Sequence, residues 1–249
     1  MRYFIELSYN GTHYHGWQIQ PDALSVQEVV ERTLSTFFRS QIKVVGAGRT
    51  DTGVHAKQLF VHLDLDEIPD IPATIFKLNS FLPKDISIQQ IRAVTHKAHA
   101  RFDATERAYE YHISLVKDPF LQGLAYHIYQ PPDIDLMNKA AAVLLQYNDF
   151  QCFSRSKTDV KTYFCSITKA VWERKDNSLR FTITADRFLR NMVRAIVGTL
   201  LDVGHGKTSI DELHQIIKGK DRSAAGASAP AHGLYLTEVA YPETIFTNE

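Results

Sequence analysis

The chain has 249 residues, 44% of them hydrophobic and 22% charged, which is typical of a soluble globular protein with one domain or two. Its 28 basic residues equal its 28 acidic residues, which excludes a protein that coats nucleic acid through net positive charge, so any nucleic-acid contact must come from a local patch. Apolar runs fall well short of the roughly 18 residues of a membrane span, and two cysteines are too few for a zinc site, so we expect a cytoplasmic protein without a bound metal.

The first half of the chain follows the order strand, helix, strand, strand, helix, strand. Residues 2–9 carry a charge within an apolar stretch, which predicts a strand rather than a signal peptide. Ser25 to Glu28 is a capping-box pattern and predicts the start of a helix with one apolar face. This order is that of the split βαβ, or ferredoxin-like, plan. The other predicted elements are strands at residues 43–47, 58–64 and 86–94 and a helix at 72–81.

The second half repeats this order without visible sequence similarity. We therefore expect an α+β protein of two ferredoxin-like, or RRM-like, halves, residues 1–103 and 104–249, whose antiparallel sheets pack together and leave a central cleft. The predicted elements of the second half are strands at residues 105–115, 164–174, 178–185 and 234–241 and helices at 135–146, 189–203 and 210–218.

A glycine-bearing loop, residues 46–56, lies between two predicted strands and holds the carboxylate of Asp51. Its glycines, Gly46, Gly48 and Gly53, permit unusual backbone shapes, so such a loop can present one side chain precisely. An isolated Asp-x-Gly is more often a simple turn. Arg49 favours a chemical role, because an arginine near a carboxylate stabilises its ionised form, which suits a nucleophile better than a general acid.

Residues 51–53, Asp-Thr-Gly, also spell the tripeptide of aspartic proteases. That chemistry requires two carboxylates that share a proton. The sequence has no second Asp-Thr-Gly, and a guanidinium at Arg49 opposes a shared proton. An aspartic protease is therefore a less favoured alternative.

Residues 48–56 (Gly-Arg-Thr-Asp-Thr-Gly-Val-His-Ala) resemble the catalytic-aspartate signature of the tRNA pseudouridine synthase A family, with Thr52 in place of the usual alanine. Several ordered blocks make a chance resemblance much less likely than a single short motif does. The further blocks that resemble this family are residues 9–18, 25–28, 79–86, 100–111, 188–194 and 231–236.

The resemblance implies a pseudouridine synthase fold and an isomerase, an intramolecular transferase, that works without a cofactor. The implied substrate is tRNA, in which uridines of the anticodon stem-loop (tRNA positions 38–40) become pseudouridine. By resemblance, Asp51 is the nucleophile and Tyr109 stacks on the target base. Arg49 and Arg190 hold the carboxylate ionised and in position. Family resemblance further implies a homodimer, in which each tRNA contacts both subunits.

Two patterns in the second half support contact with RNA. Strand alternation puts Tyr109 and Tyr111 on one face, and we interpret Tyr111 as an ordinary core aromatic. In the helix predicted at 189–203, Arg190 shares a stripe with Arg187 and Arg194, and no acidic residue occurs from residue 187 through 201. This stripe is a candidate footprint for phosphate, with a solvated surface as the alternative.

A non-catalytic RNA-binding module is the competing class, since two ferredoxin-like halves could offer their sheets to single-stranded RNA. It predicts exposed aromatic residues on both sheets. It gives no reason for an arginine-flanked aspartate in a glycine loop.

Overall fold

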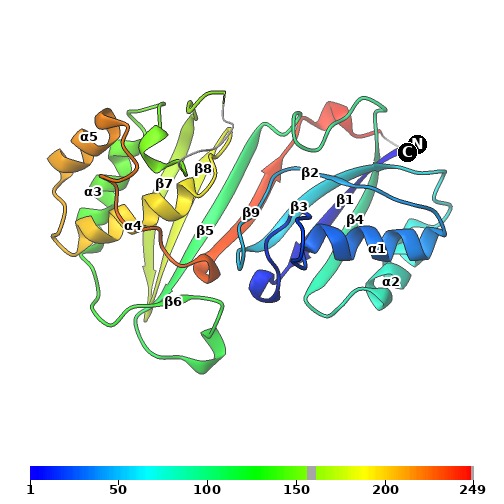
Figure 1. Ribbon diagram of the computed structural model, residues 1–249, viewed down its shortest axis with the longest axis horizontal. Coiled ribbons are helices and arrows are strands. Elements are labelled where there is room, and N and C mark those ends of the chain that lie inside the picture. The colour runs from blue at the N-terminus through cyan, green and yellow to red at the C-terminus, as the bar shows by residue number, and fades with distance from the viewer. Residues whose placement is uncertain (156–160, 248–249) are drawn as a thin grey trace. The chain divides into compact units, whose positions relative to one another are not determined.

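The computed structural model describes residues 1–155 and 161–247. The chain divides into two compact units (Figure 1). The first consists of Met1–Glu106 together with Tyr235–Glu249, and the second of Arg107–Leu234. Short 3-10 helices occur at Gly11–His13, Pro119–Leu121, Gln151–Phe153, Ala231–Gly233 and Glu243–Ile245.

The long strands of the first unit lie in the order β4–β1–β3, and neighbours are antiparallel. They are β1 (Arg2–Tyr9), β3 (His55–Asp64) and β4 (Ile86–Val94). The second edge of β3 pairs with two partners. The short β2 (Val45–Gly46) is antiparallel to the later part of β3, and β9 (Leu234–Ala240) is parallel to its start.

Helices α1 (Val26–Phe38) and α2 (Ile71–Phe81) contact each other, and α2 packs on β4. Figure 1 shows both helices on one face of strands β1, β3 and β4. Helix α1 begins where the sequence predicts, because the Ser25 hydroxyl accepts a hydrogen bond from the N–H of Glu28. The carboxylate of Asp70 caps α2 in the same way.

The second unit has strands in the order β5–β8–β7, again with antiparallel neighbours, and the short β6 (Tyr126–His127) pairs in parallel with β5. Helix α3 packs on β7 and contacts both other helices of the unit. The bounds are β5 (Glu106–Ser114), β7 (Ile167–Lys175), β8 (Ser178–Ala185), α3 (Ile134–Leu144), α4 (Met192–Gly204) and α5 (Ile210–Gly219).

The α+β class predicted from the sequence is confirmed, but the prediction of purely antiparallel sheets is wrong, because β9 is parallel to β3 and β6 is parallel to β5. Residues 235–249 were predicted to belong to the second half. In the structure they cluster with the first unit, because β9 pairs with β3 through Tyr235 and Leu236. None of the helices that the structure describes is long and apolar enough to cross a membrane.

Candidate active site

Asp51 lies in the chain between β2 and β3, within the first unit. Its side chain is half-buried, between the buried Thr50 and the exposed Thr52. Arg49 is exposed. The alternation of buried and exposed residues anchors the loop by its inward side chains and leaves the carboxylate of Asp51 accessible to a ligand.

A segment near the N-terminus fixes the backbone on both sides of Asp51. The N–H of Trp17 donates to the carbonyl oxygen of Thr50 (3.2 Å), and the N–H of Gly53 donates to the carbonyl oxygen of Tyr14 (3.2 Å). The hydroxyl groups of Tyr9 and Thr50 form a buried hydrogen bond of 2.9 Å. Because these contacts flank Asp51, the N-terminal segment sets where the carboxylate can point.

Residues 9–18 resemble the family, but no role could be predicted for them from the sequence. This segment contains two glycines, Gly11 and Gly16, and both pack closely against the backbone of the loop that carries Asp51. A β-carbon on Gly11 would lie 2.0 Å from the carbonyl oxygen of Val54, and the N–H of Gly11 donates to Nδ1 of the buried His55 (3.0 Å). The feature of the sequence that could have indicated this packing role is the presence of two glycines among the polar and aromatic residues of this segment.

The three loop glycines were all interpreted as conformational; Gly53 has such a role, and close packing explains Gly46. Gly53 has a φ of +77°, a left-handed conformation that other residues rarely adopt. A β-carbon on Gly46 would lie 2.7 Å from Nε1 of Trp17. Gly48 has open space around the position of a β-carbon, so its lack of a side chain serves no packing purpose within the described residues.

Tyr109 and Tyr111 lie in β5, in the second unit, and differ in environment. Tyr109 pairs with Ile183, is half-buried, and meets the ring of Phe188 edge to face at 5.0 Å between centroids. Tyr111 is fully buried, and its hydroxyl donates to the carbonyl oxygen of Pro230 (2.8 Å). Burial raises the pKa of Tyr111. Tyr111 is therefore a core residue, as predicted, whereas Tyr109 retains a surface that a ligand can reach.

Arg190 is exposed and precedes helix α4 rather than lying within it. The helix predicted at residues 189–203 is present, but it begins three residues later than predicted, so Arg190 does not lie on a helical stripe with Arg194. Asn191 has a φ of 67°, and this left-handed residue caps α4, which begins at Met192. Only Arg194 lies in the helix, where its Nε donates to the carbonyl oxygen of Ala229 (2.7 Å).

The side chains of Arg49 and Arg190 make no hydrogen bond or ion pair with any residue that the structure describes. Two residues of separation therefore do not bring Arg49 and Asp51 into an ion pair. Both guanidinium groups are exposed, which is the state expected of groups that bind an anionic ligand. Their roles beside Asp51 stay predictions.

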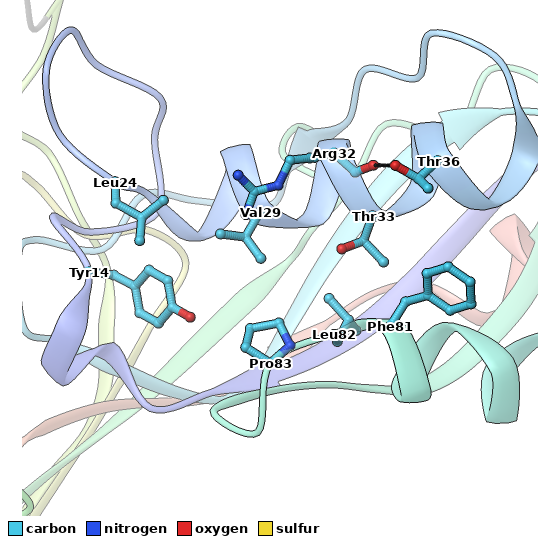
Figure 2. Close-up of a pocket in the computed structure, with 9 residues that line it drawn as sticks. All are labelled: Tyr14, Leu24, Val29, Arg32, Thr33, Thr36, Phe81, Leu82 and Pro83. Atoms are coloured by element: carbon cyan, nitrogen blue, oxygen red, sulfur yellow. Dashed lines mark hydrogen bonds between the residues drawn. The ribbon is translucent and has the colours of Figure 1, made fainter.

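A pocket of about 460 Å³ lies elsewhere in the first unit, between α1 and the end of α2 (Figure 2). The ring of Tyr14 lines this pocket, while its hydroxyl donates to Asp85 (2.7 Å) and its carbonyl oxygen binds the N–H of Gly53. The pocket contains none of the predicted site residues. The other lining residues are Leu24, Val29, Arg32, Thr33, Thr36, Phe81, Leu82 and Pro83.

No group of three or more His, Cys, Asp or Glu side chains that could hold a metal occurs in the described part of the chain. Cys152 and Cys165 are free and buried, and burial raises the pKa of each thiol to about 12. Such thiols stay protonated and are poor nucleophiles. Neither cysteine is therefore an alternative to Asp51 as a candidate nucleophile.

Comparison with known proteins identifies the family. A family model described as tRNA pseudouridine synthase matches residues 7–103 and 140–242, which include Asp51 and Arg190. The tRNA pseudouridine synthase A of Bacteroides fragilis is 52% identical over 247 residues, 98% of each chain. This chain belongs to the tRNA pseudouridine synthase A family.

Other relatives place the whole chain within this family. The tRNA pseudouridine synthase A of Porphyromonas gingivalis is 53% identical over 249 residues, 98% of this chain and 99% of the relative. That of Bacillus licheniformis is 39% identical over 246 residues, 97% of this chain and 99% of the relative. A CRISPR endoribonuclease bound to a 19-nucleotide RNA covers 82% of this chain and 97% of its own at 9% identity, but the TM-score of 0.20 supports no conclusion about the fold.

Proposed function

We propose that this chain is a tRNA pseudouridine synthase, an isomerase that breaks the bond between uracil nitrogen and ribose, turns the base and rejoins it through carbon. Family membership over almost the whole chain supports this activity. The reaction loses no atoms and transfers no electrons out of the substrate, so it requires no redox co-reactant.

The proposal assigns the nucleophile to Asp51. The observation that carries this assignment is the pair of backbone hydrogen bonds on either side of Asp51, through Thr50 and Gly53, which hold one half-buried carboxylate in a defined place. A preorganised nucleophile avoids the entropic cost of finding its geometry during the reaction. Arg49 and Arg190 are proposed to assist this carboxylate, and Tyr109 to stack on the target base.

The proposed substrate site is the anticodon stem-loop, at tRNA positions 38–40. A stacked uridine is inaccessible, so the base must leave the stack at a cost of roughly a few kcal/mol. Because neighbouring target uridines differ in sequence context, recognition rests on tRNA shape and backbone contacts. A homodimer and a central cleft stay predictions. Two ferredoxin-like halves are proposed as well, supported in the first unit by the order β4–β1–β3–β2.

The test is incubation with tRNA transcripts, followed by nucleoside analysis for pseudouridine. Wild-type protein is expected to form pseudouridine in the anticodon arm. Asp51→Asn is expected to lose turnover by more than about a thousandfold while it still folds and binds tRNA. Asp66→Asn changes an exposed carboxylate after β3 and is the matched control. Appreciable turnover by Asp51→Asn contradicts the assignment.

The alternative of a non-catalytic RNA-binding module predicts exposed aromatic residues on both sheets. Most strand aromatics in the described residues are instead buried, and the exceptions, Tyr109, Tyr126 and Tyr235, are half-buried rather than exposed. Sheets of this kind offer few stacking surfaces for single-stranded RNA. The buried strand aromatics are Tyr3, Phe4, Tyr9, Phe60, Tyr111, Trp172 and Phe181.

A further inference from the structure

Basic and aromatic residues gather in the segment that follows β4 in the first unit. From Thr95 through Phe102 the sequence has no acidic residue, although the whole chain is neutral. His96, Lys97 and Arg101 are exposed. Since the net charge gives no attraction for nucleic acid, a local concentration of positive charge is the feature that contact with RNA requires.

Phe102 is the most unusual residue of this segment, because its large apolar side chain is 73% exposed. One side of the ring meets the imidazole of His99 at 4.2 Å between centroids, with an angle of 32° between planes. The guanidinium of Arg101 lies 5.8 Å from the centroid of the same ring. An exposed aromatic ring next to a guanidinium is an arrangement that proteins use to stack on unpaired bases.

The segment is held in place by its own hydrogen bonds. Nδ1 of His99 accepts from the N–H groups of Arg101 (3.1 Å) and Phe102 (3.3 Å). The N–H of His99 donates to the carboxylate of Asp103 (2.7 Å). A turn closed in this way presents the ring of Phe102 with little conformational entropy left to lose on binding.

The sheet anchors the same turn. Ala100 is fully buried, and its N–H donates to Nδ1 of His62 in β3 (3.1 Å), while its carbonyl oxygen accepts from the hydroxyl of Tyr241 (2.6 Å). His55 begins β3 close to Asp51, and His62 lies seven residues further along. At about 3.3 Å per strand residue, the turn is roughly 20 Å from the catalytic loop.

We propose that residues 96–102 form a second tRNA contact, in which Phe102 stacks on an unpaired base and Lys97 and Arg101 neutralise phosphates. Naming tRNA as the occupant rests on the proposed function. RNA is favoured over a protein partner because the guanidinium of Arg101 adjoins the ring, Lys97 is exposed in the same segment, and no acidic residue interrupts residues 96–102. The distance from Asp51 makes this a binding contact, so its loss weakens affinity and leaves the chemical step unchanged.

The test measures tRNA affinity and its salt dependence separately from pseudouridine formation. The variant Arg101→Gln with Phe102→Ala is expected to weaken tRNA binding and raise KM at least tenfold, with kcat within a factor of two of wild type. Lys97→Gln and Arg101→Gln are each expected to lower the slope of log affinity against log salt by about 0.7. If Lys97 and Arg101 only support the fold, the slope of log affinity against log salt stays at its wild-type value.

Helix α2 provides a matched control. Phe76 is 77% exposed and is followed by the exposed Lys77, so Phe76→Ala with Lys77→Gln likewise removes one exposed phenyl ring and one exposed positive charge, here from a helix of the same unit. This control is expected to bind tRNA as wild type does. The proposal is overturned if the two double variants have the same tRNA affinity and the same salt slope. It is also overturned if Arg101→Gln with Phe102→Ala changes only the oligomeric state, because the residues that bind this surface then belong to a second copy of the chain. Absence of pseudouridine with wild-type protein instead contradicts the proposed function.

Discussion

Gly16 packs its α-carbon directly against the carbonyl group of Thr50, the residue before Asp51. A β-carbon at position 16 would lie 2.3 Å from the Thr50 carbonyl oxygen, and the φ of Gly16 is +84°. Side chains rarely tolerate either condition. This contact and the hydrogen bond from Trp17 to Thr50 bring two distant stretches of sequence together at the loop that carries Asp51.

Gly16→Ala is therefore expected to displace the loop. The left-handed backbone and the collision with Thr50 together are expected to cost about 3 kcal/mol in the free energy of unfolding and to lower kcat more than tenfold. Gly48→Ala is the control, because open space surrounds a β-carbon there, and its stability is expected to stay within about 0.5 kcal/mol of wild type. Urea denaturation and single-turnover assays measure both effects. Equal behaviour of the two variants contradicts the role of Gly16.

Tyr109 and Tyr111 give opposite expectations for the same chemical change. Tyr109→Phe keeps a ring that can meet Phe188 and stack on a base, and is expected to lower the single-turnover rate on the order of a hundredfold with stability unchanged. Tyr111→Phe leaves the Pro230 carbonyl oxygen without its buried donor, so it is expected to lose about 1–2 kcal/mol of stability and keep its rate. Tyr109→Ala with wild-type rates would show that Tyr109 is only a packing residue.

His62 is expected to make stability depend on pH. Burial, together with the charges of His99 and Arg2, lowers the pKa of His62 to about 4. Between pH 6.5 and 4 the unfolded chain binds a proton at this position and the folded chain does not, so the contribution of His62 to stability falls as pH drops through that range. Above pH 6.5 the contribution is fully present.

The measurement is the urea midpoint of wild type and His62→Gln at pH 7.5 and pH 5. A glutamine oxygen can accept the N–H of Ala100 in place of Nδ1, so the variant is a fair substitute. Wild type is expected to lose more stability than His62→Gln on acidification. An identical loss in both proteins excludes His62 as the source.

Helices, strands and loops whose bounds depend on residues nearby in the sequence could be predicted well. Strands β1, β4 and β8 have the predicted bounds, since alternation of apolar residues and flanking turn residues determine them. The start of α1 follows from the Ser25 hydroxyl, which needs only the N–H group three residues ahead. The loop with Asp51 could be found for the same reason, because its glycines and its motif are local.

Contacts between distant residues explain the differences. Asn191 is held in its left-handed conformation beside Ser228, whose hydroxyl accepts from the Asn191 amide (2.7 Å), and no helical pattern encodes that partner. Strand β3 begins at His55, earlier than predicted, where β9 joins it through Tyr235. The role of residues 9–18 could not be predicted for the same reason, because they bind Thr50 and Gly53, which are distant in the sequence.

A buried polar network links helix α1 to the loop that carries Asp51. The carboxylate of Glu31 accepts from Nε2 of Gln27 (3.0 Å) and from the N–H of Val44 (3.1 Å), and pairs with Lys43 (2.8 Å). The N–H of Gln27 in turn donates to the carbonyl oxygen of Trp17 (3.0 Å). Glu31 thus stabilises, through Gln27, the residue that binds Thr50.

Glu31→Ala removes the buried carboxylate that accepts from Nε2 of Gln27 and from the N–H of Val44, so a loss of about 3 kcal/mol is expected, together with a lower kcat because Trp17 is less firmly held through Gln27. Lys43→Gln removes the exposed partner alone and is expected to cost less than about 1 kcal/mol with kcat unchanged. Denaturation and single-turnover assays compare the two. If Glu31→Ala loses stability but keeps the wild-type rate under conditions where it is fully folded, the network supports the fold and does not position the loop.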